Sequence, residues 1–145
     1  MKKIFALLLT LAIAFSCVMF VGAEDDVTVK VNGVVIEFDV PPQIINGRTM
    51  VPMRKVFEVL GANVEWVGEM RLAVATYKTT IISMRIDEYS FSLTDVITGE
   101  TEQISLDVPA MIVGNRTLIP LRAVSEALGK TVKWDADTRT AIITG

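Results

Sequence analysis

The pattern of apolar and polar positions in this chain occurs twice, at a spacing of 68 residues. Residues 36–76 align with residues 104–144 without a gap, and 18 of the 41 aligned positions are identical. Val/Ile and Met/Leu exchanges keep further positions apolar. A self-match at a fixed period indicates a fold that uses one supersecondary unit twice.

Each copy of the pattern predicts a β-hairpin followed by a short helix. Asn46-Gly47 and Gly114-Asn115 separate apolar, β-rich runs. Such dipeptides suit two-residue turns whose central residues need positive φ. We expect the helices to begin near Pro52 and Pro120, because proline is tolerated in the first helical turn. At two to three turns, these helices are too short to be stable alone and must pack on a sheet.

The helices are recognised by apolar residues at helical spacing, which should form one buried face in each copy. These residues are Met53, Val56, Phe57 and Leu60 in the first copy, and Leu121, Val124 and Leu128 in the second. Gly61 and Gly129 follow, where a left-handed residue commonly ends a helix.

Further strands are predicted on either side of the first copy. Residues 27–31 and 34–38 alternate apolar and polar side chains around an Asn-Gly turn, which is a strong hairpin pattern. Residues 81–86, 89–96 and 101–106 read as strands in the middle of the chain. We expect this middle segment to supply the second copy with the strands that residues 27–38 supply to the first.

These elements together predict an α+β fold of two pseudo-equivalent repeats, residues 27–76 and 79–145. Each repeat would be a β-hairpin or antiparallel sheet packed on one short α-helix. Two independent domains of under about 60 residues would be marginally stable, so we expect the repeats to share one core.

The amino terminus has the pattern of a secretory signal peptide. Two lysines precede an apolar run over residues 4–21, and Gly22-Ala23 offers small residues for cleavage. We therefore expect residues 1–23 to be a signal peptide and residues 24–145 to be the folded domain. An uncleaved anchor helix and a lipoprotein signal ending at Cys17 are the alternatives.

Composition narrows the chemistry of residues 24–145. Without Lys2 and Lys3 the net charge changes from −3 to −5, and no basic face clusters in the sequence, which argues against nucleic acid as a partner. The only cysteine, Cys17, lies in the leader, and the chain contains no histidine. Zinc and copper sites use mainly those two residue types, so we expect no metal and no cofactor.

Catalysis is also disfavoured, because the common nucleophile–base pairs need histidine or cysteine. Glu58 and Glu126 could act as the paired carboxylates of a glycoside hydrolase. The simpler interpretation is that each glutamate forms an exposed ion pair with the arginine four residues before it in the helix. Asp135-Ala136-Asp137 begins like a calcium loop but lacks the later glycine and glutamate, which favours an Asp-initiated turn.

Six residues are candidates either for ligand contacts or for structural roles: Arg48, Arg54, Trp66, Arg116, Arg122 and Trp134. The tryptophans could be platforms for sugar rings, although burial against the helices is the favoured interpretation. For the arginines we favour bonds to nearby loop carbonyls or to Asp39 and Asp107, because a planar guanidinium with five donors ties loops together well.

The motif N-G-R-T-x-V-P-x-R at residues 46–54, followed by E-x-L-G and V-x-W, resembles the copper amine oxidase N-terminal-like (stalk) domain. This module is found in secreted and surface proteins of Gram-positive bacteria. Residues 67–72 of the first copy depart from the W-D-x-x-T-x-T that the second copy keeps.

The resemblance implies a secreted, non-enzymatic, stalk-like module for binding or assembly at the cell envelope. It implies neither copper nor oxidase chemistry. Its partner would be an envelope protein or a cell-wall polymer, with no membrane span after signal cleavage. A small glycan-active hydrolase and a purely structural spacer remain alternatives.

Overall fold

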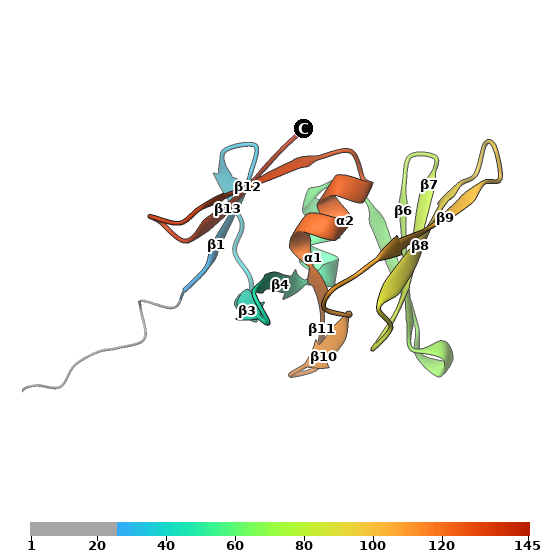
Figure 1. Cartoon of the computed structure of the whole chain (residues 1–145), viewed down its shortest axis with the longest axis horizontal. Helices are drawn as coiled ribbons and strands as arrows, with labels where there is room; N and C mark the ends of the chain where they lie inside the picture. The colour runs from blue at the N-terminus through green and yellow to red at the C-terminus, as the bar shows by residue number, and fades with distance from the viewer. Residues whose placement is uncertain (1–25) are drawn as a thin grey trace, which may run out of the picture.

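The structure, a computed structural model, describes residues 26–145, which form three β-sheets around two short helices (Figure 1). The predicted α+β class is confirmed. The signal peptide expected over residues 1–23 lies outside the described residues. Within the described part of the chain, no helix has the length and hydropathy needed to cross a membrane.

The helices are α1 (Met53–Val59), α2 (Leu121–Ala127) and a 3-10 turn, η3 (Gly68–Met70). The strands, in chain order, are β1 (Thr28–Val31), β2 (Val34–Val35), β3 (Gln43–Ile45), β4 (Arg48–Pro52), β5 (Asn63–Val67), β6 (Leu72–Tyr77), β7 (Thr80–Arg85), β8 (Ser90–Asp95), β9 (Thr101–Ser105), β10 (Met111–Val113), β11 (Arg116–Pro120), β12 (Thr131–Asp135) and β13 (Thr140–Thr144).

The predicted turns before the helices are confirmed. Asn46 and Gly47 have φ of 50° and 80°, and Gly114 and Asn115 have φ of 55° and 65°. Each pair closes a two-residue loop between paired strands. Glycine and asparagine are favoured there because other side chains crowd the backbone in the left-handed region.

We expect Gly47→Val and Gly114→Val each to lower the free energy of unfolding by about 1 kcal/mol or more. No neighbouring atom lies within 4 Å of a Cβ at either position, so the cost would come from backbone conformation alone. Gly47→Asn is the matched control, since asparagine tolerates positive φ. Urea denaturation tests this, and equal stability of the Val and Asn variants at Gly47 would contradict it.

Both helices are confirmed, and all seven residues of their predicted apolar faces are buried. Ser125, at the position equivalent to Phe57, is buried as well. Gly61 and Gly129 have φ of 94° and 82°, as expected for residues that end a helix. After each helix, the amide of the glycine and the amide that follows it bond back to carbonyls of the last turn. This is the Schellman arrangement, which satisfies helix-end carbonyls.

The two copies meet through the central sheet, whose strand order is β10-β11-β4-β3. Strands β4 and β11 pair antiparallel with Val51 opposite Ile119. These two residues occupy equivalent positions, 68 residues apart, so an approximate two-fold axis passes between them. Figure 1 shows α1 and α2 beside each other above this sheet.

The expected distribution of the outer strands is wrong. Strand β1 pairs in parallel with β13, so residues 27–38 extend the sheet of the second copy, in the order β12-β13-β1-β2. The middle strands extend the sheet of the first copy, in the order β5-β6-β7-β8-β9. The reason is chain continuity: β7 follows β6 after a two-residue turn and occupies that edge. The amino-terminal hairpin therefore pairs with the other free edge, at β13.

The second strand of the amino-terminal hairpin is also shorter than predicted, ending at Val35 rather than at residue 38. Ile36 and Phe38 leave the sheet and pack against the main core instead. The departure from the motif over residues 67–72 changes the turn, which is the 3-10 turn η3 in the first copy and a turn begun by Asp135 in the second, but the residue that closes the turn keeps its conformation. Arg71 and its counterpart Arg139 are both left-handed, with φ of 50° and 51°.

One main cluster of buried apolar residues runs through both copies. It joins residues of α1 and α2 to residues of the amino-terminal hairpin and of the middle strands, as expected for a shared core. A smaller cluster, Met50, Val108 and Leu118, involves the central sheet. Strand pairing between the two copies and the shared apolar core fix the position of one copy relative to the other. The two pockets lie between the copies.

Candidate binding pockets

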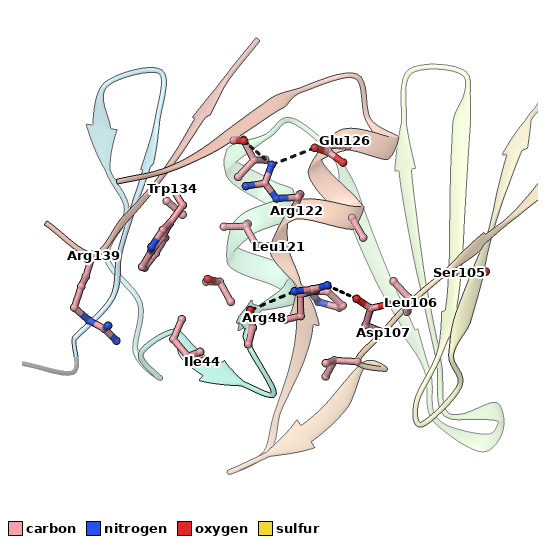
Figure 2. A pocket seen from close by; sticks show the side chains of 17 residues that line it. Ile44, Arg48, Ser105, Leu106, Asp107, Leu121, Arg122, Glu126, Trp134 and Arg139 are labelled. Carbon is pink, nitrogen blue, oxygen red and sulfur yellow. Dashed lines mark hydrogen bonds and ion pairs between the residues drawn. The ribbon is translucent and has the colours of Figure 1, made fainter. Parts of the chain in front are cut away.

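The six candidate residues come together in two pockets with three in each. Arg48, Arg122 and Trp134 line a pocket of about 670 Å³, which we call the first pocket (Figure 2). The second pocket, of about 780 Å³, is lined by Arg54, Trp66 and Arg116. Each pocket combines the hairpin arginine of one copy with the helix arginine and the tryptophan of the other copy.

The two pockets are equivalent under the approximate two-fold axis. Every residue that lines the second pocket has a counterpart 68 positions away that lines the first. The matched pairs include Ile112 with Ile44, Arg116 with Arg48, Glu58 with Glu126, and Asp39 with Asp107. A search of the sequence for single motifs cannot find this arrangement, because each pocket takes residues from both copies.

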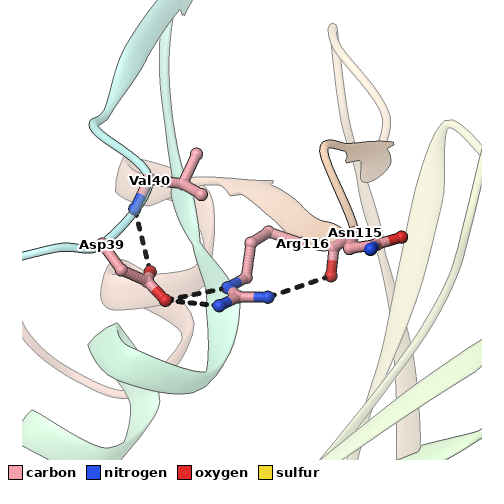
Figure 3. Close-up of polar contacts among 4 residues, drawn as sticks. All are labelled: Asp39, Val40, Asn115 and Arg116. Carbon is pink, nitrogen blue, oxygen red and sulfur yellow. Dashed lines mark hydrogen bonds and ion pairs between the residues drawn. The ribbon is translucent and has the colours of Figure 1, made fainter.

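The hairpin arginines form ion pairs that cross between the copies. Arg48 pairs with Asp107, and Arg116 pairs with Asp39. In Figure 3 the Nε of Arg116 donates to Oδ2 of Asp39 at 3.1 Å, while Oδ1 accepts the Val40 amide at 2.8 Å. Each hairpin arginine is thus joined to a loop aspartate of the other copy. The hydrogen bond from Arg116 lowers the pKa of Asp39 below its ordinary value of 3.8.

We expect Asp39→Asn to change how stability depends on pH. Because the pKa of Asp39 is lowered in the folded state, the carboxylate stabilises the fold above pH 4 and loses that contribution as the pH falls below its ordinary pKa. The stability advantage of the wild type over Asp39→Asn should therefore shrink between pH 7 and pH 3. Urea midpoints at both pH values measure this. Glu102→Gln is the matched control, and a constant advantage would contradict the prediction.

The helix arginines are held by main-chain carbonyls ten residues further along the chain. Nη1 of Arg54 donates to the carbonyl of Val64 at 3.1 Å, and Nη1 of Arg122 donates to that of Val132 at 2.7 Å. The same nitrogen of Arg122 lies 3.4 Å from Glu126, four residues away in the helix. The predicted helix-surface pairs of arginine and glutamate are thus present, and each helix is tied to the strand that follows it.

The tryptophans are less buried than expected, with 40% of Trp66 and 39% of Trp134 exposed. A strand advances about 3.3 Å per residue, whereas a helix advances about 1.5 Å. The strand that folds back after Gly129 therefore passes the start of the seven-residue helix by the time it reaches Trp134. The indole extends beyond the helix and lines the pocket, opposite Arg48 and Arg122 in Figure 2.

Ile44 and its counterpart Ile112 also line the pockets and were not among the candidates predicted from the sequence. Both belong to edge strands of the central sheet, and both are exposed. Ile44 lies on the same side of the first pocket as Trp134 (Figure 2). An exposed apolar residue at the same place in both copies is the pattern that could have indicated them.

No group of three or more His, Cys, Asp or Glu side chains within residues 26–145 is placed to hold a metal ion. At Asp135 the carboxylate accepts the amide of Asp137 at 3.0 Å, which confirms the Asp-initiated turn. We expect purified residues 24–145 to carry no stoichiometric copper or zinc, because they contain neither histidine nor cysteine. Elemental analysis tests this, and one tightly bound equivalent would contradict it.

The chain matches the family model for the copper amine oxidase N-terminal domain. The match covers residues 30–143, which include both hairpin–helix units and both pockets. It confirms the family resemblance that the sequence motifs indicated. The search of curated proteins found no match.

Proposed function

The chain belongs to the copper amine oxidase N-terminal domain family, a non-catalytic module, and from this premise we propose that it is a secreted, stalk-like binding protein of the cell envelope. In this proposal it is built from two pseudo-equivalent repeats behind a cleaved signal peptide. The partner is a polymer of the cell wall, bound in the two pockets.

The observation that carries the proposal is a half-exposed tryptophan beside an anchored arginine in both pockets. An aromatic ring offers a flat apolar surface, and a guanidinium offers several hydrogen-bond donors. Pockets of this volume suit small ligands or single units of a polymer. A large protein partner would instead use a broad, standard-sized interface. These features favour a wall polymer over an envelope protein.

Hydrolysis of that polymer is not favoured. Within the described residues, Glu58, Glu126, Asp39 and Asp107 are each paired with an arginine. A glycoside hydrolase needs one carboxylic acid with a raised pKa to protonate the leaving group. The pKa of Asp39 is shifted in the opposite direction. These pairings support binding without catalysis.

Co-sedimentation of the secreted protein with insoluble wall material tests the binding role. We expect the wild type to bind and the double variant Trp66→Ala/Trp134→Ala to lose most of the binding. Tyr89→Ala is the matched control, because Tyr89 is an aromatic residue with 64% exposure outside both pockets. Equal binding by all three proteins would contradict a role for the pockets. Absence of binding by the wild type would favour the spacer alternative.

The location of the protein can be tested on the same preparation. We expect the protein in the culture medium or the wall fraction, with Glu24 as its first residue. Fractionation and N-terminal sequencing measure both. Recovery from the membrane fraction with an intact leader would support the anchor alternative instead.

A further inference from the structure

We infer that the two pockets are separate binding sites for anionic sugar units, so that one chain holds two units. Each unit would place its ring against the tryptophan and its carboxylate or phosphate against the helix arginine. This inference rests on the proposed function and adds to it a ligand class and a stoichiometry.

The shape of the first pocket suits a ring with one apolar face. Trp134 and Ile44 lie on one side of it and Arg122 and Arg48 face them in Figure 2. Both apolar side chains are exposed, so their surface is available without rearrangement. Trp66 and Ile112 line the second pocket in the same way. A sugar ring can cover an indole face and still present its polar substituents to the arginines.

The helix arginines are positioned to receive an anion. Within the described part of the chain, the contacts of Arg122 and of Arg54 all use Nη1. That nitrogen is held by a strand carbonyl, which fixes the guanidinium in place. The donors on Nε and Nη2 can then bind a carboxylate or phosphate through two parallel hydrogen bonds. A side chain that is already fixed before the ligand arrives loses little conformational entropy on binding, which favours affinity.

Both signs of charge line each pocket. The first has Arg48 and Arg122 with Asp107 and Glu126, and the second has Arg54, Lys55 and Arg116 with Glu37, Asp39 and Glu58. In each pocket the hairpin arginine is already paired with an aspartate, so the helix arginine is the anion-binding group that the two pockets share. We therefore expect both pockets to bind the same anionic units.

The approximate two-fold axis explains why there should be two sites and not one. The β4–β11 pairing and the crossed Arg–Asp pairs place equivalent residues in equivalent surroundings on both sides of the axis. Each pocket also takes residues from both copies, so the shared core holds both sites in shape. A polymer with repeating anionic units could then occupy both sites, or the module could join two polymer strands.

The experiment uses the two tryptophans as reporters, because the sequence contains only these two. Their indole N–H signals in an NMR spectrum are assigned with the single variants Trp66→Phe and Trp134→Phe. Digalacturonate is the carboxylate probe, glucose 1-phosphate the phosphate probe and cellobiose the neutral probe. We expect both indole signals to shift with an anionic probe. Cellobiose should bind at least tenfold more weakly.

Calorimetry of the same proteins measures the stoichiometry. We expect two digalacturonate sites in the wild type, one in Trp66→Ala and one in Trp134→Ala, with Tyr89→Ala unchanged. Arg122→Gln should lower affinity for digalacturonate at the first pocket while leaving the Trp66 signal responsive. Thermal melts check that each variant is folded. The Phe variants give a second measurement if an Ala variant fails to fold.

The outcomes separate this inference from the proposed function. A single site, or equal affinity for cellobiose and digalacturonate, would overturn the inference, while wall binding that depends on the tryptophans would leave the proposed function in place. Absence of any response to all three probes would overturn the ligand class. If the wild type also fails to bind wall material, the proposed function itself would be overturned.

Discussion

Neither residues 27–76 nor residues 79–145 should fold when produced alone, and the intact protein should unfold in one step. The first half would lose β7–β9 from its sheet, and the second half would lose β1 and β2. Both would lose the β4–β11 pairing and half of the main buried cluster. A chain of this size that shares one core is expected to unfold cooperatively.

Chemical denaturation followed by circular dichroism and tryptophan fluorescence measures this. Trp66→Phe and Trp134→Phe leave one tryptophan each, so each variant reports on one copy. Coincident midpoints for both variants and for circular dichroism are the expected result. Two separate transitions, with each half cooperative by itself, would contradict the shared core. In that case the two copies would fold independently, and pockets that take residues from both copies would not be held in shape.

Truncating Leu60 or Leu128 to alanine should lower the free energy of unfolding by about 2–5 kcal/mol each. Both side chains are buried at the ends of their helices and belong to the same apolar cluster. Removing three carbons there loses apolar burial and leaves a cavity that close-packed neighbours fill only in part. The loss would be a large fraction of the roughly 5–15 kcal/mol that stabilises a domain.

The measurement is urea denaturation of Leu60→Ala, Leu128→Ala and the control Val59→Ala. Val59 is the neighbouring residue in α1 and is exposed, so its truncation should change stability by less than about 0.5 kcal/mol. In a shared core, each leucine variant should shift the single transition of the whole protein. A shift confined to part of the transition, or a cost similar to that of Val59→Ala, would contradict the expected packing.

Sequence reasoning identified the parts of this fold that depend on near neighbours. The Asn-Gly and Gly-Asn turns, the helix faces and the glycines after the helices follow from backbone preferences within a few residues. The same reasoning selected the six pocket residues, because they recur in both copies. It also named Asp39 and Asp107, beside loop carbonyls, as partners for the four arginines, although it left open which arginine pairs with which aspartate.

It did not identify the strand partners or the exposure of the tryptophans. Trp134 is apolar and lies on the same strand as the buried Val132, so pattern alone predicts that it is buried too. Trp134 is exposed because the strand extends further than the short helix beside it, so the helix covers Val132 but not Trp134. Ser125 shows the same limitation, since a polar residue is buried where the first copy has Phe57.

The sequence by itself determined the local units of this protein: two hairpins, two short amphipathic helices and the family to which they belong. Each hairpin and each helix depends on interactions between residues no more than about ten positions apart, so the local sequence is enough to predict it. Only the tertiary structure decided that β1 pairs with β13, that Arg48 reaches Asp107, and that the six candidate residues form two pockets of three. The physical reason is that these contacts join residues far apart in the chain, so they depend on where the other strands lie and not on the local sequence.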